Sequence, residues 1–309
     1  MILLLLAGSV SAACGPREVK FPDPGLEAYI RGVIKKPEGA IFPSDLIEIT
    51  EIHISGDYFD SLPPVFSDLT GLEYCVNLNI LYLEGYSIRD LSPVAGLTNL
   101  TTLGFPFNQI VDISPLASLT KLTYLYLHNN QISDISPLAT LTSLIELYLP
   151  GNQIVDISPL VSLTNLTTLY LSNNQINDIS SLSSLDSLKV LNLVGNPISN
   201  ISSLTSMTNL TKLWLHSQAI SDVSPLSTLT NLAVLGISGS QISDISPLQA
   251  MENLETLYLE DNRISDISPL MSLAKLETVR LSGNPLSRTS IEVYIPKLEE
   301  KGVRVLFTN

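Results

Sequence analysis

The chain has 309 residues, of which 45% are apolar and 15% are charged, and 30 acidic against 16 basic side chains give a net charge of −14. The acidic balance excludes nucleic acid and anionic lipid as expected partners, because both require a basic surface. Two cysteines, Cys14 and Cys75, are too few for a disulfide framework. The apolar run at the start is shorter than the roughly 20 residues that a membrane helix needs, so we expect no spanning segment.

Residues 1–13 combine an apolar stretch with small residues, which is typical of the apolar core and cleavage site of an export signal. The usual basic residues before it are missing, so we expect that the true start lies upstream or that the sequence is clipped. The residues before Cys14 are similar to a bacterial lipobox, although Ser11 stands where leucine is usual. We expect residues 1–18 to form a signal and short linker with lipidation of Cys14, the alternative being secretion after cleavage near Ala13.

Residues 19–48 predict a helical N-terminal cap. Within residues 21–39, apolar side chains recur at the i, i+3, i+4, i+7 and i+8 positions that form one face of a helix, and Pro24 suits its first turn. These side chains are Leu26, Tyr29, Ile30, Val33 and Ile34. A second short helix is predicted over residues 42–49.

A 22-residue repeat organises residues 49–286. Each repeat opens with L-x-x-L-x-L or a close variant, places asparagine eight positions after the first leucine, and continues as I-x-D-I-S-P-L. The opening leucines are Leu78, Leu100, Leu122, Leu144, Leu166, Leu188, Leu210, Leu232, Leu254 and Leu276. A degenerate repeat begins at Ile49, and its surplus length predicts an insertion over residues 56–66 that either contacts a ligand or is a tolerated surface loop.

This pattern is that of the leucine-rich repeat, and its D-I-S-P-L variety resembles the bacterial internalin-type family from Val19 to the end of the chain. The resemblance implies an α/β repeat solenoid. A curved parallel β-sheet would form the concave side, and short 3-10 or irregular turns the convex side. A helical N-cap would close one end. Residues 287–309 would form a helix–strand C-cap, in which Gly302 ends the helix.

The role of each repeat position follows from strand geometry, because neighbouring side chains on a strand point to opposite faces. Leu125 and Leu127 are expected to point into the core, so that Tyr124, Tyr126 and His128 point outward.

In the turns, each asparagine is expected to bond unpaired backbone groups and to form a ladder along the solenoid. The ladder is predicted to weaken at Gln218 and Ser240, which replace asparagine in adjacent repeats, while the position is Tyr86 in an earlier repeat. The serine of D-I-S-P is expected to cap the helical turn that proline begins. The aspartates are interpreted as turn-capping residues rather than calcium ligands, because they stack singly.

The outward position in the middle of the strand is aromatic in six of ten repeats, although the chain has only 12 tyrosine and tryptophan residues. Tyrosine and tryptophan dominate binding hot spots, so this column predicts a partner-binding surface. The predicted binding residues in the column are Tyr82, Tyr126, Tyr148, Tyr170, Trp214, Tyr258 and Arg280, flanked by Tyr124, His128, Glu146 and His216. The alternative is that cross-strand aromatic pairs merely stabilise the sheet.

The sequence contains no motif for nucleophilic catalysis, phosphate binding or metal-dependent hydrolysis. His128 and His216 share a column but lie four repeats apart, so they cannot bind one metal ion together. Cys75 occupies a position that is leucine in other repeats, so we expect it to be buried in the core. We therefore expect a monomeric, non-enzymatic module of the bacterial cell envelope, without cofactor or metal, that binds a protein through the concave aromatic residues. A glycan-binding surface protein is the alternative, and a structural spacer is a third interpretation. A membrane would be contacted only through a lipid at Cys14.

Overall fold

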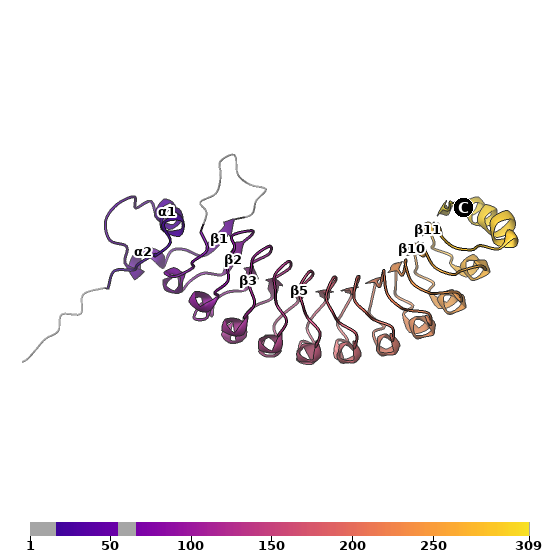
Figure 1. Ribbon diagram of the computed structural model, residues 1–309, viewed down its shortest axis with the longest axis horizontal. Helices are drawn as coiled ribbons and strands as arrows, with labels where there is room; N and C mark the ends of the chain where they lie inside the picture. The colour runs from indigo at the N-terminus through magenta and orange to yellow at the C-terminus, as the bar shows by residue number, and fades with distance from the viewer. Residues whose placement is uncertain (1–16, 55–65, 309) are drawn as a thin grey trace, which may run out of the picture.

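The structure, a computed structural model, describes residues 17–54 and 66–308. Twelve short parallel strands form a single sheet in chain order, from β1 to β12. Figure 1 shows this sheet lining the inner side of an arc, and 3-10 turns form the outer side. The predicted leucine-rich-repeat solenoid with a helix near each end is confirmed.

The strands are β1 (Glu51–Ile54), β2 (Ile80–Leu83), β3 (Thr102–Gly104), β4 (Tyr124–Tyr126), β5 (Glu146–Tyr148), β6 (Thr168–Tyr170), β7 (Val190–Asn192), β8 (Lys212–Trp214), β9 (Val234–Gly236), β10 (Thr256–Tyr258), β11 (Thr278–Arg280) and β12 (Arg304–Leu306). The α-helices are α1 (Pro24–Val33), α2 (Pro43–Leu46) and α3 (Ile295–Glu300). The 3-10 turns are Leu72–Tyr74, Ser92–Val94, Ser114–Ser118, Ser136–Thr140, Ser158–Ser162, Ser180–Ser184, Ser202–Ser206, Ser224–Thr228, Ser246–Ala250 and Ser268–Ser272.

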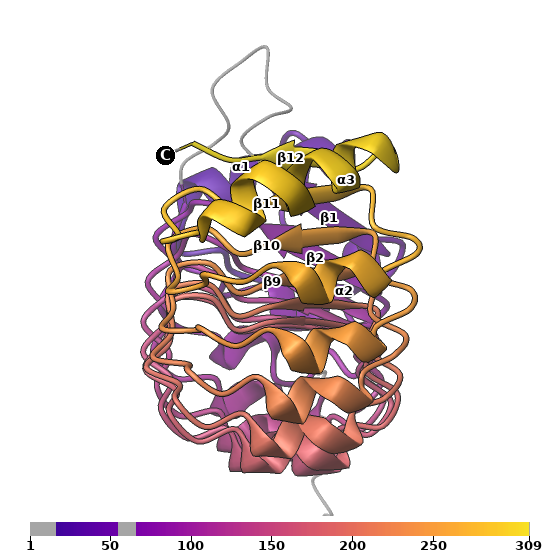
Figure 2. The ribbon, with the colours of Figure 1, turned by 90° about the vertical axis from the view of Figure 1, so that its right-hand side faces the viewer.

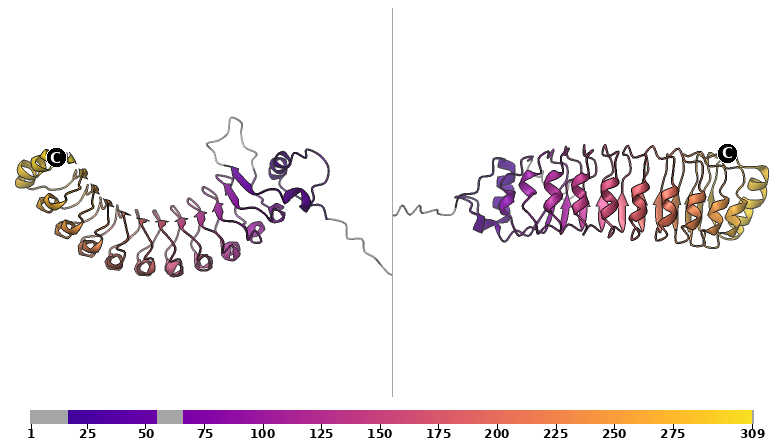
Figure 3. Two further views of the ribbon diagram at one scale, coloured as in Figure 1. Left: turned by 180° about the vertical axis from the view of Figure 1, so that it is seen from behind. Right: turned by 90° about the horizontal axis from the view of Figure 1, so that it is seen from below.

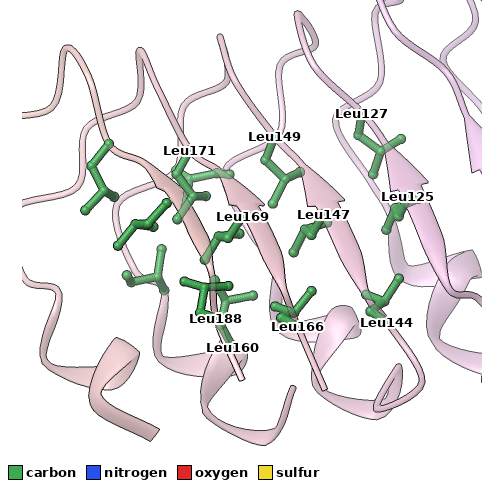
Figure 4. Close-up of a cluster of buried hydrophobic side chains, with 14 of the residues drawn as sticks. Leu125, Leu127, Leu144, Leu147, Leu149, Leu160, Leu166, Leu169, Leu171 and Leu188 are labelled. Atoms are coloured by element: carbon green, nitrogen blue, oxygen red, sulfur yellow. The ribbon is translucent and has the colours of Figure 1, made fainter. Parts of the chain in front are cut away.

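Neighbouring repeats pair without a register shift, so equivalent residues lie directly beside one another. Leu125 pairs with Leu147, and Leu147 pairs with Leu169. All three side chains are fully buried, and Figure 4 shows the resulting rows of leucines behind the sheet. Because one repeat cannot bury its apolar edge alone, the stacking of repeats creates the core.

The D-I-S-P-L segment forms the convex turns, which Figure 3 shows aligned along the outer surface. The aspartates cap these turns, as predicted, whereas the predicted capping by the serine is wrong. Asp134 Oδ1 accepts a hydrogen bond from Ser136 N at 2.8 Å, whereas Ser136 is itself the first residue of the turn. Asn200 accepts in the same way from Ser202 N at 3.0 Å, so this replacement preserves the turn.

Buried asparagines join successive repeats, as predicted. Asn130 Oδ1 accepts from Ile110 N at 3.0 Å, and its Nδ2 donates to the carbonyl oxygens of Phe105 and Leu127. The predicted weakening at Gln218 is wrong for the bonds between repeats, because its longer amide accepts from Ile198 N at 3.0 Å and donates to Leu193 O at 2.8 Å.

The ladder is interrupted at Ser240. Its hydroxyl is too short to replace the amide, and its buried Oγ has no hydrogen-bond partner among the described residues.

The N-terminal cap contains a shorter helix than its apolar pattern predicted. Asp23 begins α1 by accepting from Gly25 N at 2.9 Å, and Leu26 and Ile30 bury fully. Val33, at the end of α1, is 40% exposed, so it does not belong to the buried face. The predicted insertion lies outside the described residues except for Phe66, which is buried.

The C-terminal cap forms as predicted. Ser290–Tyr294 forms a π-helical turn that continues into α3, and Gly302 ends the helix with φ at +87°. The strand β12 then pairs with β11. Leu298 and Val303 are buried, and Figure 2 shows α3 and β12 together at this end of the solenoid.

Candidate binding surface on the concave face

The aromatic residues predicted to bind a partner lie in one column on the concave sheet. The register places Tyr126 beside Tyr148, and Tyr148 beside Tyr170. We call six of these side chains the aromatic strip. They are Tyr82, Tyr126, Tyr148, Tyr170, Trp214 and Tyr258. All six are partly exposed, while the leucines beside them on the same strands are buried.

Ring stacking makes the middle of the strip continuous. The ring centroids of Tyr126 and Tyr148 are 4.9 Å apart, and those of Tyr148 and Tyr170 are 4.7 Å apart with an interplanar angle of 10°. The two neighbours of Tyr148 lie on strands to either side of it, so both faces of its ring are covered. The centre of the strip therefore presents ring edges and phenol oxygens to a partner.

Glycines allow the strip to continue where the column has no aromatic side chain. Tyr82 lies over Gly104, where an added Cβ would be 2.1 Å from Tyr82 Cδ2, and its ring approaches that of Tyr126 edge-on at 6.1 Å. Gly236 is likewise covered by His216 and Trp214, with Nε2 of His216 only 2.3 Å from the position of an added Cβ. A side chain at either glycine would displace the aromatic ring above it.

A polar cluster forms the C-terminal end of the strip. The Arg280 guanidinium lies 5.1 Å from the ring centroid of Tyr258, and Arg280 Nη1 lies 3.7 Å from a carboxylate oxygen of Glu260. Ser238 Oγ donates to Glu260 at 2.6 Å, and Ser238 N donates to His216 Nδ1 at 3.1 Å. These contacts hold a cation on an aromatic face beside a carboxylate.

The surroundings of the strip shift the pKa values of several of its side chains towards the neutral form. Burial, with a contribution from Glu84, raises the pKa of Tyr82 to about 12. Burial and the neighbouring Glu146 also raise the pKa of Tyr148 well above its usual value. Burial lowers the pKa values of His128 and His216. The charge of this surface is therefore carried by its carboxylates, lysines and arginines.

Two further residues extend this surface and were missed from sequence. His53 on β1 stacks on Tyr82 with centroids 4.7 Å apart. Phe107 is 54% exposed and contacts the ring of His128 edge-on at 5.4 Å. A signal for Phe107 existed, because equivalent positions in other repeats hold glycine or a polar residue such as Asn129.

The other predicted sites are placed as follows. Tyr124, on the outward side of β4, is 36% exposed, while Glu146 on β5 is partly exposed beside Tyr148. Cys14 lies outside the described residues. Cys75 is fully buried, and burial raises the pKa of its thiol to about 12, as expected for a core residue.

Among residues 17–54 and 66–308, no cluster of three or more metal-binding side chains occurs, and no helix has the length and apolar character to cross a membrane.

A single sheet of parallel strands, 3-10 turns and an asparagine ladder define a leucine-rich-repeat solenoid. The family described as "Leucine Rich repeats (2 copies)" matches residues 98–140, 142–184, 186–228, 208–250 and 252–295. No curated protein sequence matches the chain.

Solved structures similar to this chain indicate which kind of leucine-rich-repeat protein it is. An internalin (InlF) from Listeria monocytogenes is 33% identical, with a TM-score of 0.79 over 97% of this chain and 95% of its own. Internalin C2 from the same species is 32% identical, with a TM-score of 0.50 over 84% of this chain and 94% of its own. The chain belongs to the internalin-type family of leucine-rich-repeat proteins.

The fold also occurs in a receptor that binds a peptide. The plant peptide hormone receptor RGFR1, solved in complex with RGF2, is 26% identical, with a TM-score of 0.65 over 77% of this chain and 41% of its own. Leucine-rich-repeat proteins of these kinds act as protein-interaction modules.

Proposed function

We propose that this chain is a non-enzymatic module, exported to the bacterial cell envelope, that binds a protein partner with the aromatic strip on its concave face. The observation that supports the proposal most is the alignment of six tyrosine and tryptophan side chains in one partly exposed column. Such side chains give a large contact area at low cost in conformational entropy, and they are enriched at interface hot spots. A large exposed aromatic patch on a soluble protein typically marks an interaction site.

The competing explanation is that the rings only stabilise the sheet, since cross-strand aromatic pairs contribute about 0.2–1 kcal/mol each. The register already places leucine beside leucine from β2 to β10, and these side chains form the buried core. Phe107 supports binding over stabilisation, because it is exposed and adopts a φ of +55°, which is unfavourable for a bulky side chain.

Replacing the strip tests this function. We expect the combined variant Tyr126→Ser, Tyr148→Ser, Tyr170→Ser and Trp214→Ser to lose capture of an envelope protein that the unmodified chain retains in pull-downs. Circular dichroism should remain unchanged, since the leucine core is intact.

A matched control replaces four exposed residues on the lateral and convex surfaces, with the changes Val111→Ser, Val155→Ser, Val161→Ser and Gln131→Ser. This control should bind as the unmodified chain does. Undiminished capture by the strip variant would refute the proposal.

Glycan binding is the second candidate function. Sugar rings stack on exposed aromatic faces, but the faces of Tyr148 are covered by Tyr126 and Tyr170. The strip thus supports a protein partner better, and a glycan array probed with the unmodified chain would test the alternative.

Export is proposed from residues 1–13, and attachment to a membrane surface from lipidation of Cys14. Mass spectrometry of the N-terminus of the mature protein, purified from its bacterium, distinguishes the two products. An acylated Cys14 supports the lipoprotein, whereas an unmodified N-terminus near Cys14 supports secretion.

A further inference from the structure

The two halves of the concave face differ in charge. On each strand among the described residues, this face consists of the outward side chains and of the side chain two positions after the central outward residue. From β1 to β6 these positions contain Glu51, Glu84 and Glu146 and no lysine or arginine. From β7 to β12 they contain three cations and one carboxylate. These are Lys212, Arg280, Arg304 and Glu260. The first half therefore has three negative charges and the second half two net positive charges.

The acidic half also presents converging oxygen atoms. Tyr148 Oη donates to Glu146 Oε2 at 3.3 Å, so a phenol oxygen and a carboxylate lie side by side. The phenol oxygen keeps lone pairs that can accept a hydrogen bond. A guanidinium carries several N–H donors in a planar fork and can bond both oxygens together, whereas an ammonium acts as a point charge.

The chain itself shows how this surface holds a guanidinium. At the C-terminal end, Arg280 lies against the ring of Tyr258 and the carboxylate of Glu260, which is two residues after that tyrosine. Tyr82 and Glu84 occupy the same two positions of their repeat. There the next strand contributes Gly104, so among the described residues no cation occupies the position equivalent to Arg280.

We propose that the acidic half of the concave face binds an arginine-bearing segment of the protein partner between β2 and β6. The proposal rests on the proposed function, since the strip must first be a protein-binding surface. Glu84 would bind one guanidinium beside Tyr82, and the Glu146–Tyr148 pair would bind another. Like-charged or neutral segments would lose these contacts, so the arrangement selects the partner as well as holding it.

Synthetic peptides test the inference on the full chain. One peptide contains several arginines in a glycine–serine background, and a second replaces each arginine by citrulline, which has nearly the same shape but no charge. We expect the arginine peptide to bind at least tenfold more tightly in calorimetric titrations, and to weaken as salt is added.

Two matched variants assign the contact. The double variant Glu84→Gln and Glu146→Gln should weaken arginine-peptide binding roughly tenfold or more. Glu255→Gln with Glu277→Gln changes the net charge equally at exposed positions beside β10 and β11, and should leave the affinity unchanged.

Equal binding of the arginine and citrulline peptides, no binding of either, or equal loss in both glutamate pairs would overturn the inference. The proposed function would still hold after any of these results if the strip variant failed to capture its protein partner. Capture of the protein partner by the strip variant would instead refute the proposed function itself.

Discussion

Aromatic residues on the concave face differ in how much of the ring is exposed and in how the ring is stabilised. Most of the strip tyrosines cover one another, so each ring is partly buried while its edge remains available. Phe107 differs, because it is more than half exposed and its backbone is left-handed, as it is at the equivalent Asn129 and Gly151. Asparagine and glycine adopt this conformation readily, whereas a bulky side chain is strained there. A strained residue at an exposed site is a candidate for selection by binding rather than by folding.

Phe107→Asn should therefore separate the two roles. We expect the free energy of unfolding to stay constant or rise by up to about 1 kcal/mol, because asparagine relieves the left-handed strain. Partner affinity should fall, since the exposed ring is lost. Urea denaturation and a binding assay on the same preparation measure both quantities. A large loss of stability with unchanged affinity would show that Phe107 serves the fold.

Secondary-structure elements in this protein are held mainly by their neighbours. Besides the predicted asparagine ladder, the structure contains a second set of amides at the other end of the strands. Asn165 Nδ2, for example, donates to the carbonyl of Thr142 in the preceding repeat at 2.9 Å. Hydroxyl groups on the convex turns do the same, as when Thr140 Oγ1 donates to Ala117 O at 2.7 Å. Each three-residue strand is thus tied to the next repeat by side chains as well as by its own backbone.

The gap in the asparagine ladder offers a direct measure of one such tie. We expect Ser240→Asn to increase stability by about 0.5–1.5 kcal/mol, the net value of a hydrogen bond in a protein, because the amide can reach the backbone of the preceding repeat. Thermal unfolding followed by circular dichroism would record a higher Tm. The reverse change, Asn130→Ser, should lower it by a similar or larger amount, since buried groups around Asn130 lose their partners. A lower Tm for Ser240→Asn would mean that the site lacks room for the amide.

At the scale of the whole molecule, stability depends on closing both ends of a one-dimensional stack. At the N-terminal end, Asp23 Oδ2 accepts from Ser67 N at 2.9 Å and so ties the start of α1 to the first repeat. At the C-terminal end, Leu298 of α3 is 1% exposed and belongs to the continuous core. Without such caps the terminal repeats would expose apolar surface.

Leu298→Glu should open the C-terminal end. Burying a carboxylate in an apolar site carries a large penalty, so we expect destabilisation on the order of 3 kcal/mol. Hydrogen exchange should then show faster exchange of the amides in β11 and β12, while β4 to β6 remain protected. The control Lys297→Glu changes an exposed neighbour on the same helix and should alter exchange little. Uniform loss of protection along the sheet would indicate that the solenoid unfolds as a single unit.

The repeat length, the buried leucines and the column that contains the tyrosines could all be predicted from the order of the residues. This was possible because every repeat places the same residue types at the same spacing, and a strand must alternate between core and solvent. The residues alone also placed Cys75 in the core and predicted the C-terminal helix, for which Gly302 is a local stop signal.

The contacts between residues of different repeats could not be predicted in this way, because they depend on how the repeats pack. That Gln218 can replace asparagine depends on the reach of one side chain to the backbone of another repeat. The covering of Gly104 by Tyr82 and the covered faces of Tyr148 likewise depend on the zero register shift and on ring rotation between strands. The exposure of Val33 depends on where α1 packs against the first repeat. Such contacts join positions 20 or more residues apart, and a local pattern contains no information about their geometry.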